Sequence, residues 1–491
     1  MVRSATDVVV IGSGPNGLTA AVTMARAGLE VIVLEAQAVA GGGARTLDSP
    51  QADGLREDIC SAVHPQALAS PAFGEFDFAA RGVELIAPEV SYAQPLDDGR
   101  AAIAYRSLER TVAELGPDGP AWQHFFAPLV ENAGLLTELA LGDRRHVPAG
   151  LGSVRGLRAL AAAGLRVLEQ ATPAWNLRFS SDLGPALLTG VAAHAIAPLP
   201  SPAASGTAMM LATQAHTVGW PIPVGGSGSL TAALIADLEA HGGRVVTDAE
   251  VRSWTDLPRA RAYLADTSPA GLVQIWGERM RPSVRRALER FRYGDAAAKV
   301  DYVLSGPVPW ADPRVGEAAT VHVGGTREQM AAAENEVASG RMPQRPMALF
   351  SDPAIADPGR IVGGLRPGWA YAHVPAGHPG DITEALTAQI ERFAPGFRDV
   401  VVSARCTPAS QMSVHNANYI GGDIASGALS TWGLLARPRL AWDPYRVSIP
   451  GVYLCSQSTP PAPGVHGMSG WHAARRALAQ RFSLPVPSLA P

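Results

Sequence analysis

Three glycines near the start of the chain have a spacing that lets a phosphate group approach the backbone. Gly12, Gly14 and Gly17 follow residues 8–11, an uncharged run of valine and isoleucine typical of a strand buried on both faces of a parallel sheet. The first glycine permits a tight turn, the second admits a pyrophosphate, and the third lets the next helix pack on the strand. That helix, expected over residues 18–27, would point its unpaired N-terminal amides at the anion.

A second strand and an acidic residue complete this unit. Residues 31–34 form another buried apolar run, and Glu35 follows 18 residues after Gly17. A carboxylate at this position accepts hydrogen bonds from ribose hydroxyls. Glycines beside a strand are also ordinary turn residues, but the two strands, the helix and the acid together favour a dinucleotide site. The same site is predicted to include three neighbouring residues, Pro15, Asn16 and Ala36.

The run Gly-Gly-Gly-Ala-Arg at residues 41–45 follows this unit directly. Its glycines leave backbone amides open and its arginine adds positive charge, which suits a second contact with a phosphate or ribityl chain. The alternative is a flexible loop, and the position just after Glu35 favours binding. The predicted contacts are Gly42, Gly43, Ala44 and Arg45.

Composition narrows the class of protein. A chain of 491 residues suggests two or three domains with sizeable cores. The net charge of −4 gives no argument for a nucleic-acid partner. Apolar residues make up 47% and charged residues 17%, so the surface carries few charges or much of it is covered. Lys299 is the only lysine.

Cysteine usage and hydropathy bear on location. Cys60, Cys406 and Cys455 lie far apart, and no C-x-x-C is present, so neither a redox dithiol nor a zinc site is indicated. The first residues include Asp7 and lead directly into the first strand, so they do not resemble a signal peptide. No stretch approaches the ~18 apolar residues that a spanning helix needs. We therefore expect a cytoplasmic protein with at most peripheral membrane contact.

The middle of the chain lacks a second unit of the opening type. Residues 106–115 and 120–141 are predicted helices, and residues 151–171 form a third, rich in alanine and leucine with three arginines. This third helix would either lie on a membrane surface or be buried as a channel wall with its arginines reaching out, and the second interpretation is favoured.

The run at 223–234, Pro-Val-Gly-Gly-Ser-Gly-Ser-Leu and onward, resembles a phosphate loop but does not qualify as one. No buried strand precedes it, and Thr231 occupies the place of the third glycine. We therefore expect no separate NAD(P) site. A helix over 230–241 and a strand from 242 to Val251 are predicted to follow.

A separate, antiparallel sheet is expected further along. Its candidate strands are 296–304, 321–324, 346–351 and 369–374. Asp381 and Glu384 have the spacing of a capping box, which predicts a helix that Pro395 ends.

The C-terminal segment repeats the opening pattern. A strand over 452–455, a loop and a glycine turn at 464–468 precede a helix over 469–481. A helix N-terminus at this point would receive an anion. The alternative is an ordinary packing helix, and this segment alone leaves both interpretations open.

Six motifs together resemble the phytoene-dehydrogenase-related flavoproteins of the glutathione-reductase/amine-oxidase superfamily. They are VVVIGSGPNGL at 8–18, GGGAR at 41–45, PVGGSGSLTAAL at 223–234, KVDYVL at 299–304, NYIGGDI at 418–424 and YLCSQSTPPAPGVHGMSG at 453–470. The resemblance implies non-covalent FAD, with the N-terminal motif on the ADP part and the C-terminal motif at the isoalloxazine. It adds six cofactor contacts: Val251, Ser456, Gly464, Val465, Gly467 and Met468.

One departure from the family concerns the flavin side. The family usually reads H-P-G-G-G-V where this chain has Pro460-Pro-Ala-Pro-Gly-Val465, so Ala462 and Pro463 replace two glycines. Pro463 has no N–H to offer the ribityl chain. FAD is therefore expected to bind with altered geometry or affinity.

Lys299 is the candidate catalytic residue. In related amine oxidases a strand lysine holds a water at flavin N5, and KVDYVL resembles that strand. Lys299 and Asp301 share one strand face, so an ordinary ion pair is the alternative. Four further polar candidates are His466, His415, Asn418 and Tyr419.

Three functions remain open. The leading one is a desaturase or dehydrogenase acting on C–C bonds of a lipophilic substrate, with oxygen or a quinone as acceptor. The second is an amine oxidase, which an aromatic pair beside the flavin would support; its possible members are Trp432, Trp442, Tyr445 and Trp471. The third is a non-enzymatic prenyl or lipid escort.

The expected fold is α/β, with a discontinuous Rossmann-like FAD domain and a mixed α+β substrate domain. The FAD domain is assigned to residues 1–75, 221–295 and 410–491. The substrate domain is assigned to residues 76–220 and 296–409.

Overall fold

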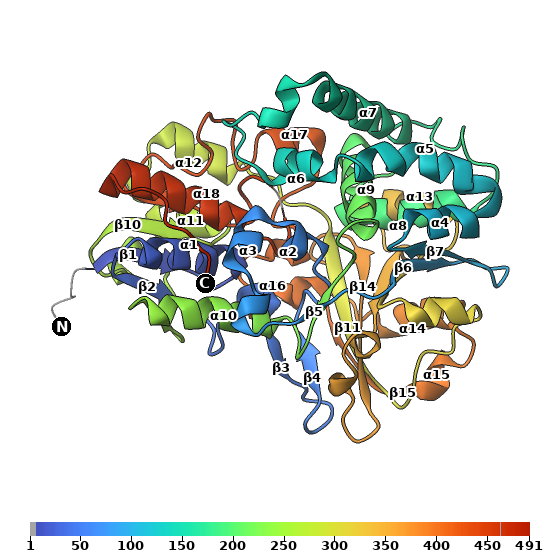
Figure 1. The fold of residues 1–491 in the computed structure, drawn as a ribbon. Helices are drawn as coiled ribbons and strands as arrows, with labels where there is room; N and C mark the ends of the chain where they lie inside the picture. The colour runs from blue at the N-terminus through green and yellow to red at the C-terminus, as the bar shows by residue number, and fades with distance from the viewer. Residues whose placement is uncertain (1–5, 462) are drawn as a thin grey trace.

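The computed structural model describes residues 6–461 and 463–491. Two sheets organise the chain, and Figure 1 shows the first on the left and the second at the lower right. A group of helices forms a third region above the second sheet. The fold is therefore mixed α/β, as the sequence predicts.

The first sheet has five parallel strands in the order β16-β10-β1-β2-β9. In chain order they are β1 (Thr6–Ile11), β2 (Val31–Leu34), β9 (Arg244–Val246), β10 (Ala260–Ala265) and β16 (Val452–Leu454). Alternate residues of β1 enter two separate cores. Val8 and Val10 lie in one core, while Val9 and Ile11 lie in the other, because successive strand residues point to opposite faces. This explains why the opening run is apolar without alternation.

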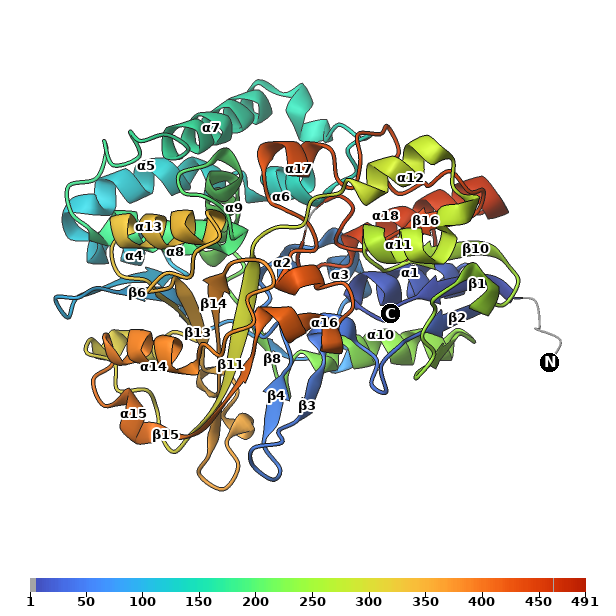
Figure 2. The ribbon, with the colours of Figure 1, turned by 180° about the vertical axis from the view of Figure 1, so that it is seen from behind.

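Helices cover both faces of this sheet. One face packs against α1 (Pro15–Arg26), α10 (Gly228–Ala240) and α18 (Met468–Ala477). The other packs against α11 (Pro269–Trp276) and α12 (Pro282–Glu289), which Figure 2 shows from behind. The first and last helices of the set, α1 and α18, contact each other although the whole chain separates them.

The second sheet has seven strands in the order β15-β11-β14-β13-β12-β6-β7. They are β6 (Val90–Pro95), β7 (Ala101–Tyr105), β11 (Ala296–Leu304), β12 (Thr320–Val323), β13 (Ala348–Ser351), β14 (Arg366–Val374) and β15 (Val401–Thr407). All neighbours are antiparallel except β12 and β6. One face packs against α14 (Thr383–Glu391) and α15 (Phe397–Val400), and the opposite face looks toward the helical region and the first sheet.

The helical region has its own core of leucine, alanine and aromatic side chains. It contains α4 (Leu108–Glu114), α5 (Gly119–Val130), α6 (Ala133–Leu141), α7 (Val154–Gln170), α8 (Leu183–Ala192), α9 (Pro202–Ala215) and α13 (Arg327–Ala338). The remaining short elements are β3 (Thr46–Asp48), β4 (Arg56–Asp58), α2 (Pro65–Ala69), α3 (Pro71–Phe76), β5 (Leu85–Ile86), β8 (Ile222–Pro223), α16 (Met412–His415) and α17 (Thr431–Leu435). Among the described residues, no helix is long and apolar enough to cross a membrane.

Helix α7 follows the sequence expectation of a buried helix with exposed arginines only at Arg155 and Arg158, which are exposed. Arg166 is buried and donates hydrogen bonds to the backbone carbonyls of residues 124, 125 and 162. Five of its large apolar residues are also exposed: Val154 by 67%, Leu157 by 57%, Leu160 by 43%, Leu165 by 66% and Leu168 by 61%. The outer face of α7 therefore combines apolar residues with arginines.

Three local predictions are wrong in detail. The helix expected over 120–141 breaks into α5 and α6, because the Asn132 side chain donates to the Pro128 carbonyl and competes with the helical bond. The strand expected to reach Val251 ends at Val246, since the chain turns at Asp248 with φ +52°. The capping box predicted at Asp381 is displaced: α14 begins at Thr383 with Ile382 as N-cap, and the Asp381 carboxylate accepts from the Thr383 amide over 2.7 Å.

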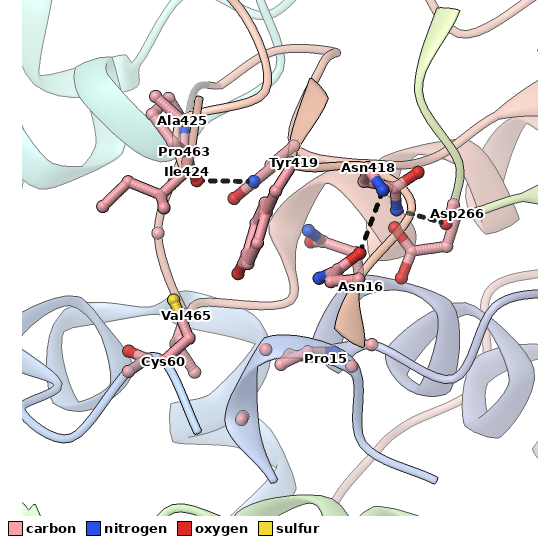
Figure 3. Close-up of a pocket in the computed structure, with 18 of the residues that line it drawn as sticks. Pro15, Asn16, Cys60, Asp266, Asn418, Tyr419, Ile424, Ala425, Pro463 and Val465 are labelled. Carbon is pink, nitrogen blue, oxygen red and sulfur yellow. Dashed lines mark hydrogen bonds between the residues drawn. The ribbon is translucent and has the colours of Figure 1, made fainter. Parts of the chain in front are cut away.

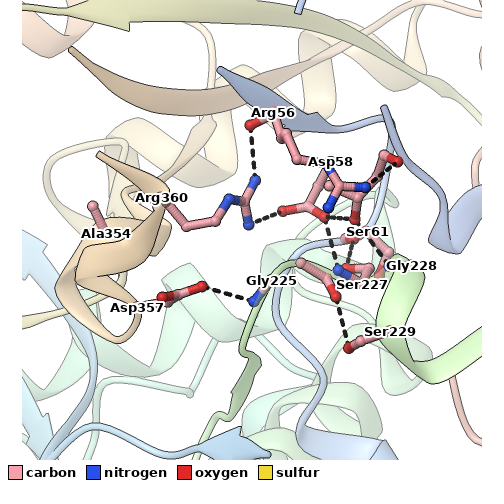
Figure 4. A network of polar contacts seen from close by, with 12 residues as sticks. Arg56, Asp58, Ser61, Gly225, Ser227, Gly228, Ser229, Ala354, Asp357 and Arg360 are labelled. Carbon is pink, nitrogen blue, oxygen red and sulfur yellow. Dashed lines mark hydrogen bonds and ion pairs between the residues drawn. The ribbon is translucent and has the colours of Figure 1, made fainter. Parts of the chain in front are cut away.

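The glycine run at 223–234 is a structural junction, as Figure 4 shows. The amide of Gly225 donates to Asp357 Oδ2 over 2.7 Å, and the amide of Ser227 donates to Asp58 Oδ1 over 2.9 Å. Asp58 in turn binds Arg360 over 3.0 Å, with both side chains buried. These two amides donate to carboxylates of the protein itself, so the glycines of this run have a structural role.

The predicted division into two domains remains a prediction. The strands of the parallel sheet all fall in the ranges assigned to the FAD domain, and the strands of the seven-stranded sheet all fall in the ranges assigned to the substrate domain. Residues 1–5 of the first range lie outside the described residues.

Candidate functional site

A cavity of about 730 Å³ lies between the two sheets. Its walls include many residues predicted from the sequence to bind a dinucleotide. Those lining it are Gly12, Gly14, Pro15, Asn16, Glu35, Ala36, Gly42, Gly43, Ala44, Arg45, Val251, Gly464 and Val465. Four predicted contacts do not line it: Gly17, Ser456, Gly467 and Met468. Figure 3 shows the part of the wall between Pro15 and Val465.

The glycine turn is packed too closely for side chains. Gly12 has φ +90°, and a Cβ built on it would lie 2.7 Å from the Asp266 carbonyl oxygen. A Cβ on Gly42, which has φ +58°, would lie 2.8 Å from the Gly14 Cα. Helix α1 begins beside this turn with Gly14 as N-cap, and the amide of its third residue, Gly17, donates to Asp266 Oδ2. A narrow backbone cradle at a helix N-terminus fits the pyrophosphate of a dinucleotide.

Glu35 is held in place by the turn that it follows. Its Oε2 accepts from the Ser13 amide over 2.9 Å and from the Ser13 hydroxyl over 2.5 Å, and its Oε1 accepts from the Gln37 amide over 2.9 Å. The carboxylate lines the cavity and keeps lone pairs for further donors. This arrangement orients Glu35 as a ribose acceptor requires.

Residues 41–45 form a structured turn at the cavity wall. Gly42–Ala44 is a 3₁₀ turn, and Arg45 donates to the carbonyls of Gly42 over 2.8 Å and His415 over 2.5 Å. A Cβ on Gly43 would collide with the Tyr419 hydroxyl. The Arg45 side chain is therefore a fixed positive charge beside the predicted nucleotide position.

Asp266 is a site residue that the sequence analysis missed. It follows β10 directly, lines the cavity (Figure 3), and accepts a hydrogen bond from the Gly17 amide over 2.9 Å. Burial, opposed by the Gly17 hydrogen bond and helped by the nearby Glu35, raises the pKa of Asp266 to about 7. A carboxyl that takes up a proton this easily can sit near a phosphate with little repulsion. The signal in the sequence is an acid after a buried strand, but residues 260–265 were not predicted to form one.

The C-terminal turn meets the N-terminal one. Gly464, Val465 and His466 line the cavity, and Gly467 begins α18 with φ +67°. The His466 Nδ1 accepts from the Met468 amide over 3.0 Å, so this ring helps to cap α18. A Cβ on Gly470 would collide with the Asn16 carbonyl oxygen, which shows how tightly α18 packs on α1.

Of the two residues that replace family glycines at the flavin-side turn, the structure describes one. Pro463 lines the cavity, while Ala462 lies outside the described residues. The altered affinity expected from these two positions stays a prediction.

Lys299 lies on the face of the second sheet that looks toward the cavity but does not line the cavity itself. It stands opposite Tyr371 of β14, which does line it. The Lys299 ammonium pairs with the Asp301 carboxylate and donates to the Asp58 carbonyl over 2.9 Å. It lies 5.9 Å from the ring centre of Trp369, another lining residue. The geometry therefore contains the ion pair of the alternative interpretation, and the catalytic role stays a prediction.

The other polar candidates all line the cavity. Asn418 accepts from the Ser268 amide over 2.7 Å and donates to the Asp266 carbonyl over 3.2 Å (Figure 3). Burial lowers the pKa of His415 to about 4. Tyr419 packs against Gly43, so His415, Asn418 and Tyr419 belong to the nucleotide end of the cavity.

The aromatic residues of the cavity are not those expected. None of the four predicted candidates lines it; Trp432 and Trp442 are 66% and 80% exposed, and the Tyr445 hydroxyl donates to the Pro460 carbonyl. The lining aromatics are Trp220, Trp369, Tyr371 and Tyr419. The ring centres of Trp369 and Tyr371 lie 5.3 Å apart in an edge-to-face arrangement, because both side chains project from one face of β14.

The far end of the cavity is largely apolar. Its walls include Ile196, Met210, Leu211, Leu349, Ile424, Leu429 and Leu434. The carboxylates that line the cavity are Glu35, Glu250 and Asp266, which all lie at the nucleotide end. Among the described lining residues, the only lysine or arginine is Arg45, at the same end.

Comparisons with known proteins agree with this geometry. Residues 10–73 match the NAD(P)-binding Rossmann-like domain. The chain is 27% identical to an uncharacterized protein of Mycobacterium tuberculosis, covering 96% of this chain and 97% of that one. It is 24% identical to pyridine nucleotide-disulfide oxidoreductase domain-containing protein 2 of Rattus norvegicus, covering 95% and 92%.

Two shorter matches concern named activities. One of the limonene dehydrogenase subunits of Castellaniella defragrans is 27% identical over 164 residues, which is 33% of this chain and 29% of that one. Hydroxyneurosporene desaturase of Rhodobacter capsulatus is 56% identical over 48 residues, 10% of each chain.

Solved structures establish the fold. A mutant of putrescine oxidase matches with a TM-score of 0.60 at 16% identity, covering 97% of this chain and 99% of that one. An oxidoreductase from Methanosarcina mazei matches with a TM-score of 0.59 at 14% identity, covering 94% and 98%. The chain has the fold of FAD-dependent oxidoreductases, with a parallel Rossmann-like sheet and a second, mixed sheet.

Proposed function

We propose that this protein is an FAD-dependent oxidoreductase that removes a hydride from an uncharged, lipophilic small molecule, as a C–C desaturase or dehydrogenase does. The observation that carries the proposal is the far end of the cavity, which has apolar walls and no carboxylate among the described lining residues. An ammonium group buried there would lack a counter-charge, whereas a hydrocarbon loses nothing by leaving water.

The residues at the other end support FAD as the cofactor. The Gly12–Gly14 turn and the start of α1 would hold the pyrophosphate, Glu35 the ribose, and the turn before α18 the flavin side. Bound FAD supplies an acceptor for a hydride. The chain would orient the substrate between the two sheets. The largely apolar walls of the far end would also exclude water from the reaction.

Amine oxidation is the second candidate, and one observation favours it. Trp369 and Tyr371 form an aromatic pair in the cavity, and aromatic faces attract cations. The putrescine oxidase fold match points the same way. A cation held by rings alone would be bound more weakly than one held by rings and a carboxylate.

Anaerobic titration distinguishes these candidates. We expect limonene or a linear polyene to bleach the flavin absorbance of the purified protein, and putrescine and cyclohexylamine to leave it unchanged. NADH and NADPH serve as controls for a separate nucleotide site and are expected to cause no rapid bleaching. Bleaching by the amines alone would establish the second candidate, and binding of polyenes to a flavin-free protein would establish the lipid escort.

We further propose that the outer face of α7 contacts a lipid surface. Five large apolar residues of α7 are exposed, and Arg155 and Arg158 are exposed beside them. Behind α7 lies a second, apolar cavity of about 480 Å³, and Ala140, Gly206 and Met210 line both this cavity and the main one. The two exposed arginines would bind anionic lipid headgroups. The two adjoining cavities would form a path for a lipophilic substrate from the membrane to the site.

Vesicle binding tests this surface. The wild-type protein is expected to sediment with anionic phosphatidylglycerol vesicles, and Leu157→Asp with Leu165→Asp to weaken partitioning at least about tenfold. Val402→Asp is the control, because Val402 is 56% exposed on β15, far from α7. Equal partitioning of the double variant would refute the proposal. A dimer that the double variant loses would instead assign the face to a second copy.

A further inference from the structure

The substrate end of the cavity contains buried hydrogen-bonding groups that the proposed function does not use. Thr320 and Trp369 line the cavity, and their Oγ1 and Nε1 atoms are buried with no hydrogen-bond partner among the described residues. Thr320 is 1% exposed. Buried polar groups are nearly always satisfied, so two unsatisfied groups on one cavity wall indicate a missing ligand.

Strand register places these two groups in one row. Thr320 of β12 stands opposite Ser351 of β13, and Ser351 stands opposite Trp369 of β14. Residues directly opposite in antiparallel strands project from the same face. Ser351 Oγ, between them, is also without a partner among the described residues. The row therefore offers an indole N–H donor and two hydroxyls that both donate and accept.

A pair of histidines adjoins this row. His322 shares a face of β12 with Thr320, and its Nε2 lies 2.8 Å from the Nε2 of His194, which lines the cavity. Since His194 uses Nε2 for His322, Nδ1 is the ring nitrogen left for a ligand. Burial and the nearby His373 lower the pKa of His194 to about 3, and burial, His194 and His373 lower the pKa of His322 well below its ordinary value. Both rings are therefore uncharged at neutral pH.

The backbone around this pair is built to hold it. Gly190 of α8 lets His322 approach, since a Cβ there would lie 2.8 Å from the His322 Cβ. Just after His194, Ile196 adopts φ +45°, a conformation that β-branched residues rarely take, and it lines the cavity. Such outliers persist where the surrounding structure enforces them, which is common at binding sites.

The charges around the row define the ligand. No carboxylate lines this end of the cavity within the described chain, so an ammonium group finds no counter-ion. No lysine or arginine of the described residues lines it either, so a carboxylate or phosphate is equally disfavoured. Donors and acceptors without charge match a hydroxyl or a carbonyl group.

We propose that Thr320, Trp369 and His194 form a subsite for one uncharged oxygen function, a hydroxyl or carbonyl, on an otherwise lipophilic substrate. This inference rests on the proposed function and refines its substrate class. Ser351 extends the row behind the wall, and His322 positions His194. The apolar residues around the subsite would hold the hydrocarbon part.

Equilibrium binding to the purified holoprotein, without turnover, tests the subsite. The probes are matched pairs that differ in one oxygen: limonene with perillyl alcohol, and farnesene with farnesol. We expect each alcohol to bind about tenfold more tightly than its hydrocarbon, the effect of one or two well-made hydrogen bonds. Thr320→Val with Trp369→Phe should reduce the ratio of alcohol affinity to hydrocarbon affinity to about onefold.

Thr387→Val is the matched control, because Thr387 is buried on α14 and its hydroxyl bonds to the Tyr302 hydroxyl away from the cavity. This variant should keep the full preference for alcohols. The subsite is refuted if wild-type protein binds alcohols and hydrocarbons equally, binds neither alcohol, or if the double variant retains the preference. Binding is measured without flavin reduction, so the two proposals fail separately. Absence of an alcohol preference in the wild-type protein would refute the subsite but not the oxidoreductase proposal. Absence of flavin reduction would refute the oxidoreductase proposal but not the subsite.

Discussion

Replacing Gly14 with valine is expected to give protein that purifies with less than about a tenth of the wild-type flavin content. A Cβ at this position would lie 2.7 Å from Asp266 Oδ2, and the remaining methyl groups would enter the space where the pyrophosphate approaches the turn. The measurement is the ratio of flavin to protein absorbance after purification.

Two further variants separate the causes of this loss. Gly74→Val is the control, since Gly74 lies on α3 and a Cβ there meets no atom within 4 Å. The double variant Gly14→Val, Asp266→Ala removes the carboxylate that the new Cβ would touch. We expect it to remain flavin-poor, because valine still blocks the pyrophosphate. Full recovery of FAD in the double variant, or full flavin in Gly14→Val alone, would contradict the placement of the cofactor.

Replacing Lys299 with methionine is expected to keep FAD bound and to slow either flavin reduction or its reoxidation by about 10²-fold. The change keeps the side-chain length and removes an ammonium that lies beside Trp369 at the cavity wall. It also leaves the buried Asp301 carboxylate without its main partner. Breaking a buried pair in this way costs about 3–5 kcal/mol of stability, so thermal unfolding should shift downward as well.

The pair Lys299→Met, Asp301→Asn separates catalysis from structure. Removing both charges should restore most of the lost stability, because no unpaired carboxylate remains. If Lys299 has an electrostatic role in the reaction, stopped-flow rates of the affected half-reaction stay about 10²-fold low in the double variant. Recovery of the rates together with the stability would assign Lys299 to the ion pair alone.

The β1-α1-β2 unit beside the cavity was predictable because its signals are local. The turn from Gly12 to Gly17, the second strand and Glu35 form one continuous segment, and close packing leaves no room for a Cβ at Gly12, Gly14 or Gly17. The predicted strand at 296–304 was likewise found as β11, since its apolar residues identify it directly. Neither inference needed knowledge of distant contacts.

The substrate end was not predictable, because it depends on contacts between distant segments. Asp266, at the nucleotide end, was missed for the same reason: it meets Gly17, 249 residues away along the chain, because β10 lies beside β1 in the sheet. Trp220 and Trp369 line the cavity but belong to no sequence motif. Trp432 and Trp442 are of the same residue type but are exposed to solvent and do not line it. The strands β6 and β7 were missed because their pattern gives no clear alternation, as both faces are buried.

The most direct test of this account is the visible spectrum of the wild-type protein before and after acid precipitation. We predict a flavin spectrum equivalent to one FAD per chain, with all of the flavin released into the supernatant as FAD. A protein that purifies without flavin and does not take it up on addition, or a flavin that stays with the precipitate, would contradict the non-covalent FAD site between the two sheets.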